Sequence, residues 1–383
     1  MGAQGAQGAQ GAQGAQGAQG AQGAQGAQGA ALGVDSAGLA DALITTRDGI
    51  VGHWGPPAPN PDHHGVEAAA NAALWDPAYR AVVLDFELVS RLGFSAEAGA
   101  VSVWHLGTQA GNPPAATYQP LAKFTRPGEA VFKEQLQFLR SYADLRPDRA
   151  TEILAQLTVP APFLGAIALL RPDTKRWTLE LLDTVFRLAG FVEHRVKHAL
   201  ACRRPIEFSP QVQPMIQTPG HGSLPSGHAT EAFAGALVFW ELMRATGTKP
   251  YGDPSYGVQL MRLAARIAIN RQVAGVHFPV DSVAGALLGL TLGDYFVARA
   301  DGAAAARKYL AAHFDGAAAG IGDADFLFTD LYDLDQPGVR FGAPGHASVK
   351  AFDLGAGHEI DLAPDLPSPP LEWLWGKAKA EWQ

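Results

Sequence analysis

The sequence has little of the material that defines several protein classes. It contains one cysteine, Cys202, among 383 residues. A single thiol excludes an intrachain disulfide and a four-thiolate zinc site. Basic residues are also few, because 29 Lys and Arg face 37 Asp and Glu, for a net charge of −8. Nucleic acids and anionic membrane surfaces usually bind proteins with a basic excess. We therefore expect no nucleic-acid partner, and any anion site must be local.

Long hydrophobic runs are lacking as well. The first 36 residues carry no Lys, no Arg and no apolar run, so they lack the parts of a secretory signal. The longest apolar stretch, Ser282–Ala298, has 17 residues and contains Asp294, whereas a helix needs about 20 apolar residues to cross a bilayer. We expect this stretch to be a buried helix, and we predict a cytoplasmic protein without a membrane span.

Residues 2–28 are nine copies of Gly-Ala-Gln. Glycine at every third position is typical of collagen, but the tract has no proline to favour the extended helix, so we predict that it is disordered. The rest of the chain is long enough for one large core or two ordinary ones. We divide it into a low-complexity and irregular lead-in (1–65), a helical catalytic domain (66–316) and an irregular tail (317–383).

Hydrophobic residues recur three and four apart through most of the middle of the chain. Proline or glycine separates the segments with this helical pattern, which are 66–92, 129–144, 148–157, 174–203, 228–246, 255–270 and 279–300. Strand patterns are few, and we treat Trp104–Pro127 as an irregular excursion. The prediction is an all-α helical bundle. The aromatic segment Leu371–Gln383 should pack on this bundle or on a second subunit, which makes a homodimer plausible.

Three short segments place anion-binding or proton-transferring groups at helix boundaries. In the first, Lys197 and Arg204 are seven residues apart, so both cations can project from one helix face. Pro205 ends the helix at Arg204. Taken alone, the segment is equally typical of a basic helix end that complements the macrodipole.

The second segment runs from His221 to His228 and ends in Pro-Ser-Gly-His before an apolar helix. Ser226 and Gly227 would point free backbone N–H groups and the positive end of the helix dipole at one place, which suits an oxyanion. His228 adds a titratable group there. Ordinary capping by Ser226 is the alternative.

The third segment is Asn270–Asp281. Pro279 suits the first position of the following helix, which puts His277 just before that helix and Asp281 in its first turn. The carboxylate can then orient the imidazole. Arg271 brings a third cation, so Lys197, Arg204 and Arg271 together suit an oxyanion of two or three negative charges. We predict an anion-binding pocket at the ends of these helices.

The patterns K-x6-R-P, P-S-G-H and R-x5-H-x3-D, in this order, resemble the signatures of one superfamily. It unites type 2 phosphatidic acid phosphatases, class A bacterial acid phosphatases and vanadium-dependent haloperoxidases. The motifs span residues 197–281, and the helices of 150–300 are similar in order to the core of that family. The chain departs from the pattern at Asn270, where the family usually has serine.

The resemblance implies a role for each motif residue. Three cations, Lys197, Arg204 and Arg271, would hold the equatorial oxygens of phosphate or vanadate. Ser226 and the Gly227 N–H would donate to the same oxygens, and His228 would act as acid and base. His277 would be the nucleophile toward phosphorus or the ligand of vanadium, oriented by Asp281. His221 and Asn270 would contact these groups and hold them in position without binding the anion themselves.

The same site serves two chemistries. With vanadate as cofactor it would oxidise bromide or iodide with hydrogen peroxide, and without it a phosphate ester would be hydrolysed through a phosphohistidine. His221, seven residues before His228, is similar to the bromoperoxidase form, and so is the sequence from Arg271 to His277. His194, where haloperoxidases usually carry an aromatic residue, favours the phosphatase, as does the short interval between His228 and Arg271. We predict a haloperoxidase first and a soluble acid phosphatase as the alternative.

Three further hypotheses stay open at this point. His194 and His198 could be zinc ligands, although the cations around them disfavour a metal ion. Cys202 could be a reactive thiol, but no base partner is identified for it. Finally, the chain could be a non-catalytic anion-binding module that assembles through its Gly-Ala-Gln head, and such a module would tolerate the loss of His277.

Overall fold

The computed structural model describes residues 37–55, 63–109, 111–157, 160–302, 309–333, 349–351, 359–360 and 368–383. The Gly-Ala-Gln repeat, for which we predicted disorder, lies outside these ranges. The chain divides into two compact units, Met1–Leu84 and Asp85–Gln383. The domain boundaries that we placed at residues 66 and 316 stay predictions.

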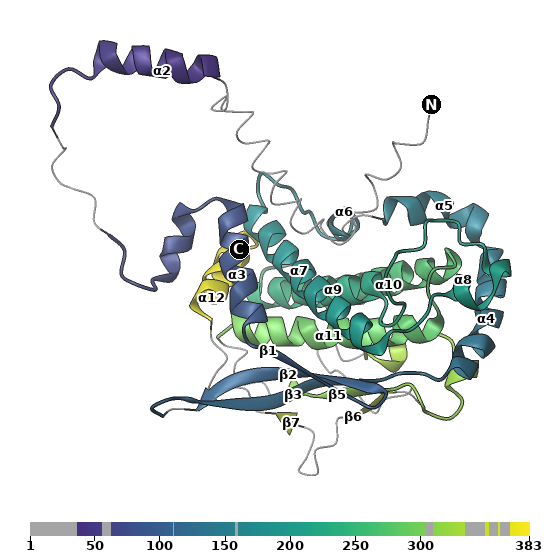
Figure 1. Ribbon diagram of the computed structural model, residues 1–383. Helices are drawn as coiled ribbons and strands as arrows, with labels where there is room; N and C mark the ends of the chain where they lie inside the picture. The colour runs from purple at the N-terminus through teal and green to yellow at the C-terminus, as the bar shows by residue number, and fades with distance from the viewer. Residues whose placement is uncertain are drawn as a thin grey trace. The chain divides into compact units, whose positions relative to one another are not determined.

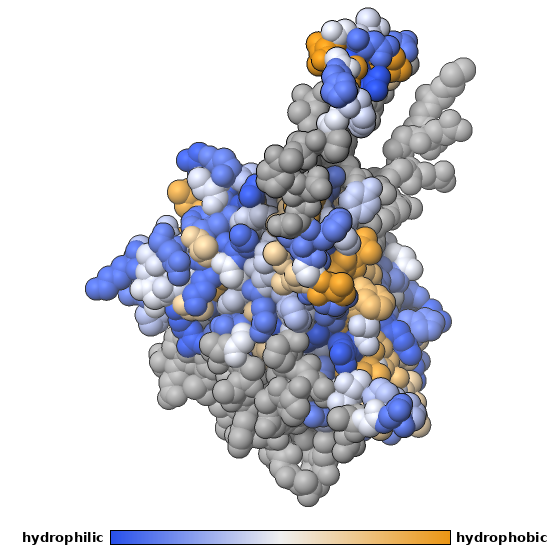
Figure 2. Space-filling view, turned by 90° about the vertical axis from the view of Figure 1, so that its left-hand side faces the viewer, coloured by the Kyte–Doolittle hydropathy of each residue, from blue (hydrophilic) through white to orange (hydrophobic). Residues whose placement is uncertain are grey.

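The first unit contributes short helical elements. Helix α2 spans Ala37–Ile50, the 3-10 helix η2 spans Ala69–Leu74, and α3 (Pro77–Val89) begins in this unit. We predicted irregular chain as far as residue 65, so α2 is a difference; its sequence is rich in alanine and leucine, which favour helix locally. Side chains of α3 such as Tyr79, Val82 and Phe86 are exposed. Figure 2 shows one face of the molecule, on which hydrophobic side chains gather among hydrophilic ones.

The second unit is built around long helices (Figure 1). Each helical segment predicted between residues 129 and 300 coincides with one of them. These helices are α4 (Glu129–Ala143), α5 (Arg146–Ala155), α7 (Arg176–Leu200), α9 (Gly227–Thr246), α10 (Pro254–Val273) and α11 (Pro279–Ala300). Two short helices, α6 (Ala161–Gly165) and α8 (Pro205–Phe208), lie in the connections. Helix α9 is central, since it packs against α7, α10 and α11.

A sheet accompanies the helices, so the prediction of an all-α fold was wrong. Its five strands lie in the order β1 (Leu92–Glu97), β2 (Ala100–Gln109), β3 (Ala115–Thr125), β5 (Ala312–Asp315) and β6 (Val349–Ala351). Only the β3–β5 pair in this sheet is parallel. A separate pair joins β4 (Tyr309–Leu310) to β7 (Glu359–Ile360). Strands β3 and β5 contact α11, and Figure 1 shows the sheet along one side of the helices.

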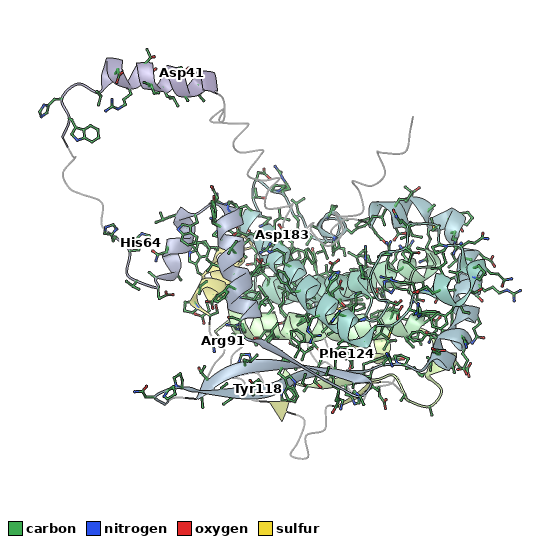
Figure 3. The ribbon with its side chains drawn as sticks, in the orientation of Figure 1. Asp41, His64, Arg91, Tyr118, Phe124 and Asp183 are labelled. Carbon is green, nitrogen blue, oxygen red and sulfur yellow. The ribbon has the colours of Figure 1, made fainter. Side chains whose placement is uncertain are left out.

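The segment that we expected to be irregular, Trp104–Pro127, contains most of β2 and β3. A β-bulge hides the strand pattern: Val103 pairs with Ala122 and Trp104 with Pro120, which leaves Leu121 as an extra residue. Residues 120–122 are buried in succession, so the alternation of period two is lost there. Phe124 of β3 is buried against Phe314, whereas Tyr118 of the same strand is exposed (Figure 3).

Three glycines let α11 approach α9 closely. A Cβ on Gly285 would lie 2.5 Å from the carbonyl oxygen of Ser226, and one on Gly289 would overlap the carbonyl oxygen of Thr230. Gly293 continues the row one turn later, beside Leu237. The approach also lets the backbone N–H of Ser226 donate to the carbonyl oxygen of Asp281 at 2.8 Å. Two of the three motif segments are therefore joined directly.

The chain ends in α12 (Pro369–Ala380), which packs on α7, α9 and α11. Leu371, Leu374 and Trp375 are buried in this contact. The prediction that the aromatic tail packs on the bundle is confirmed. The homodimer stays a prediction, and the buried side chains supply no free surface for it.

Helix α11 is long and apolar enough, by length and composition alone, to cross a membrane. We argued from a 17-residue run that this segment was too short, but the helix has 22 residues. In its most apolar stretch 94% of the residues are buried inside the structure. The prediction of a buried helix is therefore confirmed.

Candidate active site

The first motif lies where α7 ends. Lys197 is in the last turn of that helix, and Ala201 closes it in the left-handed conformation. Arg204 follows as the residue before α8, with Pro205 at the first helical position. Pro205 thus separates the two cations into different elements, and both side chains are nonetheless buried.

The second motif forms the start of α9, as predicted. Ser226 is the N-cap residue, but its side chain makes no capping hydrogen bond. Its hydroxyl is buried without a hydrogen-bond partner among the described residues. Ordinary capping therefore does not explain Ser226, and the hydroxyl is free to donate to a ligand.

The third motif brings His277 and Asp281 together. Nδ1 of His277 lies 3.0 Å from Oδ2 of Asp281. The same carboxylate oxygen accepts from the backbone N–H of Phe278 at 2.9 Å and from the hydroxyl of Ser223. Because an ionised carboxylate only accepts, Nδ1 of His277 carries the proton and Nε2 is the unprotonated nitrogen, whose lone pair can accept a hydrogen bond. We predicted this orienting contact from the spacing of the two residues.

Nε2 of His277 faces Arg204. One guanidinium nitrogen, Nη1, lies 2.9 Å from Nε2 and donates to the carbonyl oxygen of Val276 at 2.8 Å. The guanidinium also donates through Nε to the carbonyl oxygen of His221, at 3.0 Å, and Nη2 lies 3.1 Å from Nδ1 of that histidine. The first and third motifs, 73 residues apart in sequence, therefore meet at one nitrogen, and His221 supports Arg204 from the side.

Arg271 and Asn270 are held by the end of α5. Nη2 of Arg271 donates to the carbonyl oxygen of Ile153 at 3.2 Å. Asn270 donates to the side-chain oxygen of Gln156 at 2.8 Å and accepts from Arg149 at 3.0 Å. The Asn270 amide thus binds two neighbouring side chains, those of Gln156 and Arg149.

His228 is the second residue of α9 and is partly exposed. Its Nε2 lies 3.0 Å from the carbonyl oxygen of Gln156. A carbonyl can only accept, so Nε2 carries a proton and Nδ1 is the unprotonated nitrogen of the neutral ring.

Buried donor groups without partners converge on the three motifs. Among the described residues these atoms are Nζ of Lys197, Oγ of Ser226, and Nε and Nη1 of Arg271. The cations and the histidine of the motifs expose little surface. The exposed fractions are 2% for Lys197, 3% for Arg204, 1% for Arg271 and 4% for His277. Since buried polar groups are nearly always paired, these donors indicate a ligand with several acceptor oxygens. A tetrahedral oxyanion fits them.

Burial and the mutual repulsion of the cations set the ionisation of the site. Burial lowers the pKa of Arg204 and of Arg271 to about 10, so both stay charged at pH 7. Burial, Arg204 and Lys197 hold the pKa of His277 well below its usual value. Its imidazole is therefore neutral at pH 7, as a nucleophile must be. Burial raises the pKa of Asp281 to about 6, although its hydrogen bonds to Ser223 and Phe278 oppose that rise.

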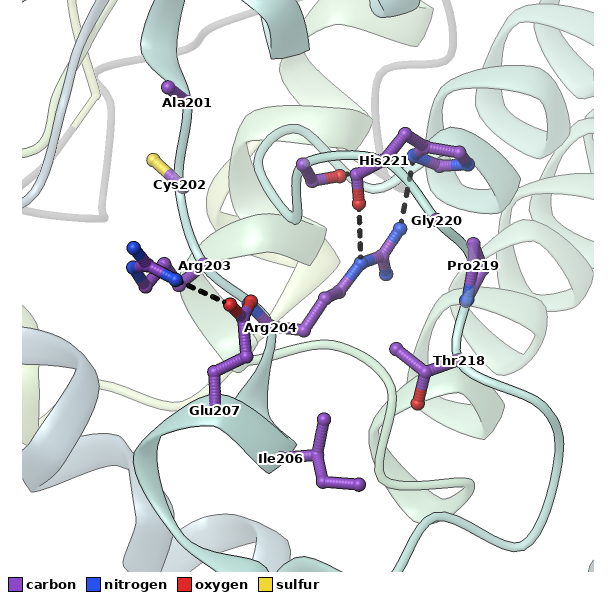
Figure 4. A pocket seen from close by; sticks show the side chains of 11 residues that line it. Ala201, Cys202, Arg203, Arg204, Ile206, Glu207, Thr218, Pro219, Gly220 and His221 are labelled. Carbon is purple, nitrogen blue, oxygen red and sulfur yellow. Dashed lines mark hydrogen bonds and ion pairs between the residues drawn. The ribbon is translucent and has the colours of Figure 1, made fainter.

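A pocket of about 470 Å³ adjoins Arg204 and His221 (Figure 4). Its wall is formed by the end of α7, the start of α8 and the loop before the second motif, with Thr218, Pro219 and Ile206 among the lining residues. The ring of His221 also contacts that of His194, with centroids 4.9 Å apart. His194 and His221, which had separate roles in our sequence-based hypotheses, thus lie side by side next to Arg204.

Three residues that contact the motifs were not predicted from the sequence. Gln156 comes from α5, some 70 residues before the second motif, and no local pattern connects it to the site. Ser223 stands within the second segment, where its hydroxyl could have suggested a partner for Asp281. Glu193 lies one turn before Lys197 on α7, 3.4 Å from its ammonium group. That spacing of four residues is the usual signal for a helical ion pair.

The alternatives of zinc and a reactive thiol receive no support. The described residues contain no group of three or more His, Cys, Asp or Glu side chains that could hold a metal ion. His198, the residue after Lys197, is exposed. His194 contacts His221 instead. Burial raises the pKa of the Cys202 thiol to about 12, so it remains protonated.

Comparisons with known proteins agree with this geometry. A family model, the PAP2 superfamily, matches residues 180–301, which contain all three motifs. The decaprenylphosphoryl-5-phosphoribose phosphatase of Mycobacterium tuberculosis is 34% identical over 147 residues, which cover 38% of this chain and 72% of the phosphatase. The vanadium-dependent bromoperoxidase of Ascophyllum nodosum is 35% identical over 94 residues, but these cover only 20% of this chain and 17% of the peroxidase.

One solved structure, a transmembrane PAP2 type phosphatidylglycerolphosphate phosphatase from Bacillus subtilis, is also similar. It shares 20% identity with a TM-score of 0.35, over 43% of this chain and 84% of that one. The M. tuberculosis phosphatase is matched over most of its length, and the family model spans the three motifs of this chain. This chain belongs to the PAP2 superfamily, which we expected from those motifs.

Proposed function

We propose that the protein is a phosphatase that hydrolyses phosphate monoesters through a phosphohistidine at His277. One observation carries this proposal: buried donors of Lys197, Ser226 and Arg271 without hydrogen-bond partners lie in the same three motifs as an imidazole that Asp281 orients. We expected a haloperoxidase first. The relatives reverse that order, because the matched phosphatase is covered over most of its length and the matched peroxidase over a small part.

The first half of the reaction would transfer the phosphoryl group to the protein. Nε2 of His277 attacks phosphorus while the bond from phosphorus to the ester oxygen breaks. Arg204, Lys197 and Arg271 neutralise the charge on the equatorial oxygens, and Ser226 and the N-terminus of α9 donate to them. The Asp281 carboxylate stabilises the positive charge that develops on the imidazole.

His228 would handle the protons. It gives a proton to the leaving alkoxide, and in the second half it removes one from the water that attacks the phosphohistidine. Arg271 and burial lower the pKa of His228, so the ring is neutral without substrate. A bound phosphoryl group brings negative charge close to it, which raises that pKa and lets the ring act as an acid. The contact with the carbonyl oxygen of Gln156 fixes the orientation of the ring.

The leaving group would occupy the pocket beside Arg204 and His221. This pocket is about 470 Å³ in volume and opens at the edge of the anion site. Its lining combines the hydroxyl of Thr218 and backbone groups of two glycines with Pro219 and Ile206. Such a surface suits a small alcohol with both polar and apolar parts.

Haloperoxidase activity is the second candidate, and the match to a bromoperoxidase favours it. The donors that fit phosphate would also hold vanadate, with His277 as the vanadium ligand. Vanadate would activate hydrogen peroxide for the oxidation of bromide or iodide. His221 supports Arg204 in either case.

The cytoplasmic location that we predicted has no support in the structure or in the relatives, and it is not part of the proposed function.

The deciding experiment compares the two activities in one preparation. Purified protein free of vanadate is assayed with para-nitrophenyl phosphate, and then with vanadate, hydrogen peroxide and bromide or iodide. We expect ester hydrolysis that vanadate inhibits, and no halide oxidation. Halide oxidation after vanadate loading, with negligible ester hydrolysis before it, would reverse the assignment.

A variant separates catalysis from simple anion binding. His277→Ala should abolish hydrolysis, with at least about a thousandfold loss, since the nucleophile is removed. Arg171→Ala is a suitable control because this exposed arginine pairs with Asp173, and neither residue lines the pocket. Circular dichroism should show the same helix content for both. Full activity of His277→Ala would favour the non-catalytic anion-binding module.

A further inference from the structure

Glu193 places a negative charge inside the anion site. It lies on α7, one turn before Lys197, and its side chain is 4% exposed. Oε1 is 3.4 Å from Nζ of Lys197 and 3.3 Å from Nδ1 of His194. Oε2 is buried and has no hydrogen-bond partner among the described residues. A buried carboxylate with one free oxygen is costly, so its position calls for an explanation.

The carboxylate also lies against the second motif. A Cβ on Gly227 would be 2.5 Å from Oε2 and 2.6 Å from Oε1 of Glu193. Gly227 is the first residue of α9, and the N-terminus of a helix attracts anions. Glu193 therefore occupies the side of α9 that is also expected to receive the phosphoryl oxygens. Its presence explains why this position of the motif has no side chain.

A second carboxyl group completes the cluster. Glu231 stands one turn after Gly227 on α9, and burial together with the Glu193 carboxylate raises its pKa to about 8. Glu231 is then mostly neutral at pH 7. The other groups nearby, His221, His228 and His277, have lowered pKa values and are neutral too. The Glu193 carboxylate, 3.4 Å from Nζ, is the acidic group paired with Lys197, whereas the Asp281 carboxylate contacts His277.

We propose that Glu193 sets the oxyanion affinity of the site: its carboxylate limits how tightly the site binds phosphate and similar anions. Its carboxylate reduces by one the positive charge that a phosphoryl group meets, and it stands closest to Lys197. This inference rests on the proposed phosphatase function, in which inorganic phosphate must leave after each turnover. Without Glu193, the remaining carboxylate would be that of Asp281, which His277 engages, and a site with three buried cations would retain its product.

The test removes the charge and keeps the shape. In Glu193→Gln, inorganic phosphate should bind about tenfold more tightly, because a unit charge within a few ångströms of a buried anion is removed. Isothermal titration calorimetry at pH 7 measures this affinity directly. The inhibition constant of phosphate against para-nitrophenyl phosphate should fall by the same factor. Glu193→Met, of similar volume and equally uncharged, repeats the test in case the glutamine variant does not fold.

The matched control is Glu241→Gln. Glu241 is also a buried glutamate of the bundle, paired with Arg244 at 2.6 Å, but it lies 14 residues further along α9 than Gly227, about 21 Å away at the usual helical rise. Phosphate affinity should be unchanged in this variant. Glu193→Asp keeps the charge and should keep an affinity close to that of the unmodified protein.

Unchanged or weaker phosphate binding in folded Glu193→Gln and Glu193→Met would overturn the inference. Tighter binding of equal size in Glu241→Gln would also overturn it, because the effect would then not depend on the site. Calorimetry needs no turnover. A protein that binds phosphate but hydrolyses no ester would therefore contradict the proposed function alone, and the comparison of Glu193 variants would still decide this proposal.

Discussion

Oδ2 of Asp281 lies 3.0 Å from Nδ1 of His277, across the start of α11. The oxygen is held in turn by the backbone N–H of Phe278 and by the hydroxyl of Ser223. The contact determines which nitrogen of His277 carries the proton and therefore which one can attack phosphorus. It also places a negative charge behind the ring, where the imidazole becomes positive as the phosphohistidine forms.

The first prediction concerns this carboxylate. Asp281→Asn should lower kcat by about 10²–10⁴-fold, because the amide can donate to Nδ1 and favour the wrong tautomer, and it cannot offset the positive charge. The measurement is steady-state hydrolysis of para-nitrophenyl phosphate. Asp253→Asn, a change at the exposed N-cap of α10, serves as the control and should leave kcat unchanged.

The pH profile should carry the same signature. The pKa of Asp281 is raised to about 6, chiefly by burial. A raised pKa means that the carboxylate takes up its proton as the pH falls through about 6, well above the usual range of an aspartate. Activity of the unmodified protein should therefore decline below pH 6, while His277 stays neutral because its own pKa is lower still. A decline that persists unchanged in Asp281→Asn would rule out this carboxyl group as its cause.

The second prediction concerns the pocket beside Arg204. Thr218→Trp should fill much of it, since Thr218 forms part of its wall. We expect KM for esters with bulky leaving groups to rise about tenfold or more, as is usual when a contact worth one or two kcal/mol is lost. The affinity for inorganic phosphate should not change. Thr218→Ser keeps the hydroxyl and the space, so its KM values should match those of the unmodified protein. Equal KM changes for phosphate esters of all sizes would contradict the assignment of the pocket.

The third prediction concerns the packing of α11 on α9. Gly289→Ala should destabilise the fold by about 1–3 kcal/mol, because the added Cβ would overlap the backbone carbonyl of Thr230. Gly190→Ala is the matched control in the interior of α7, where a Cβ would meet nothing within 4 Å. That change should raise stability by up to about 1 kcal/mol through helix propensity. Urea denaturation compares the two, and equal effects of both substitutions would refute the packing argument.

Much of the bundle could be predicted because its signals are local. The segments 174–203, 228–246 and 279–300 repeat hydrophobic residues with a helical period, and helices appear at Arg176–Leu200, Gly227–Thr246 and Pro279–Ala300. Pro279 marked a helix start for the same reason, since a proline has no N–H to lose there. Pro205 marked the place by which the preceding helix had to end. The sheet was missed because the bulge at Leu121 interrupts the alternation by which a strand is recognised.

By itself the sequence determined the chemical inventory of the site. It specified three cations, a histidine with an orienting aspartate four residues later, and a Ser-Gly turn at a helix start, because those relationships act within one or two helical turns. Only the tertiary structure decided that Gln156, just after α5, contacts Arg271 and Asn270, that Arg204 meets His277, and that the Glu193 carboxylate lies against Gly227. Those contacts join elements that are far apart in the chain, so they depend on how closely whole elements approach one another. The glycine row of α11 sets one such distance, that between α11 and α9, by a steric limit.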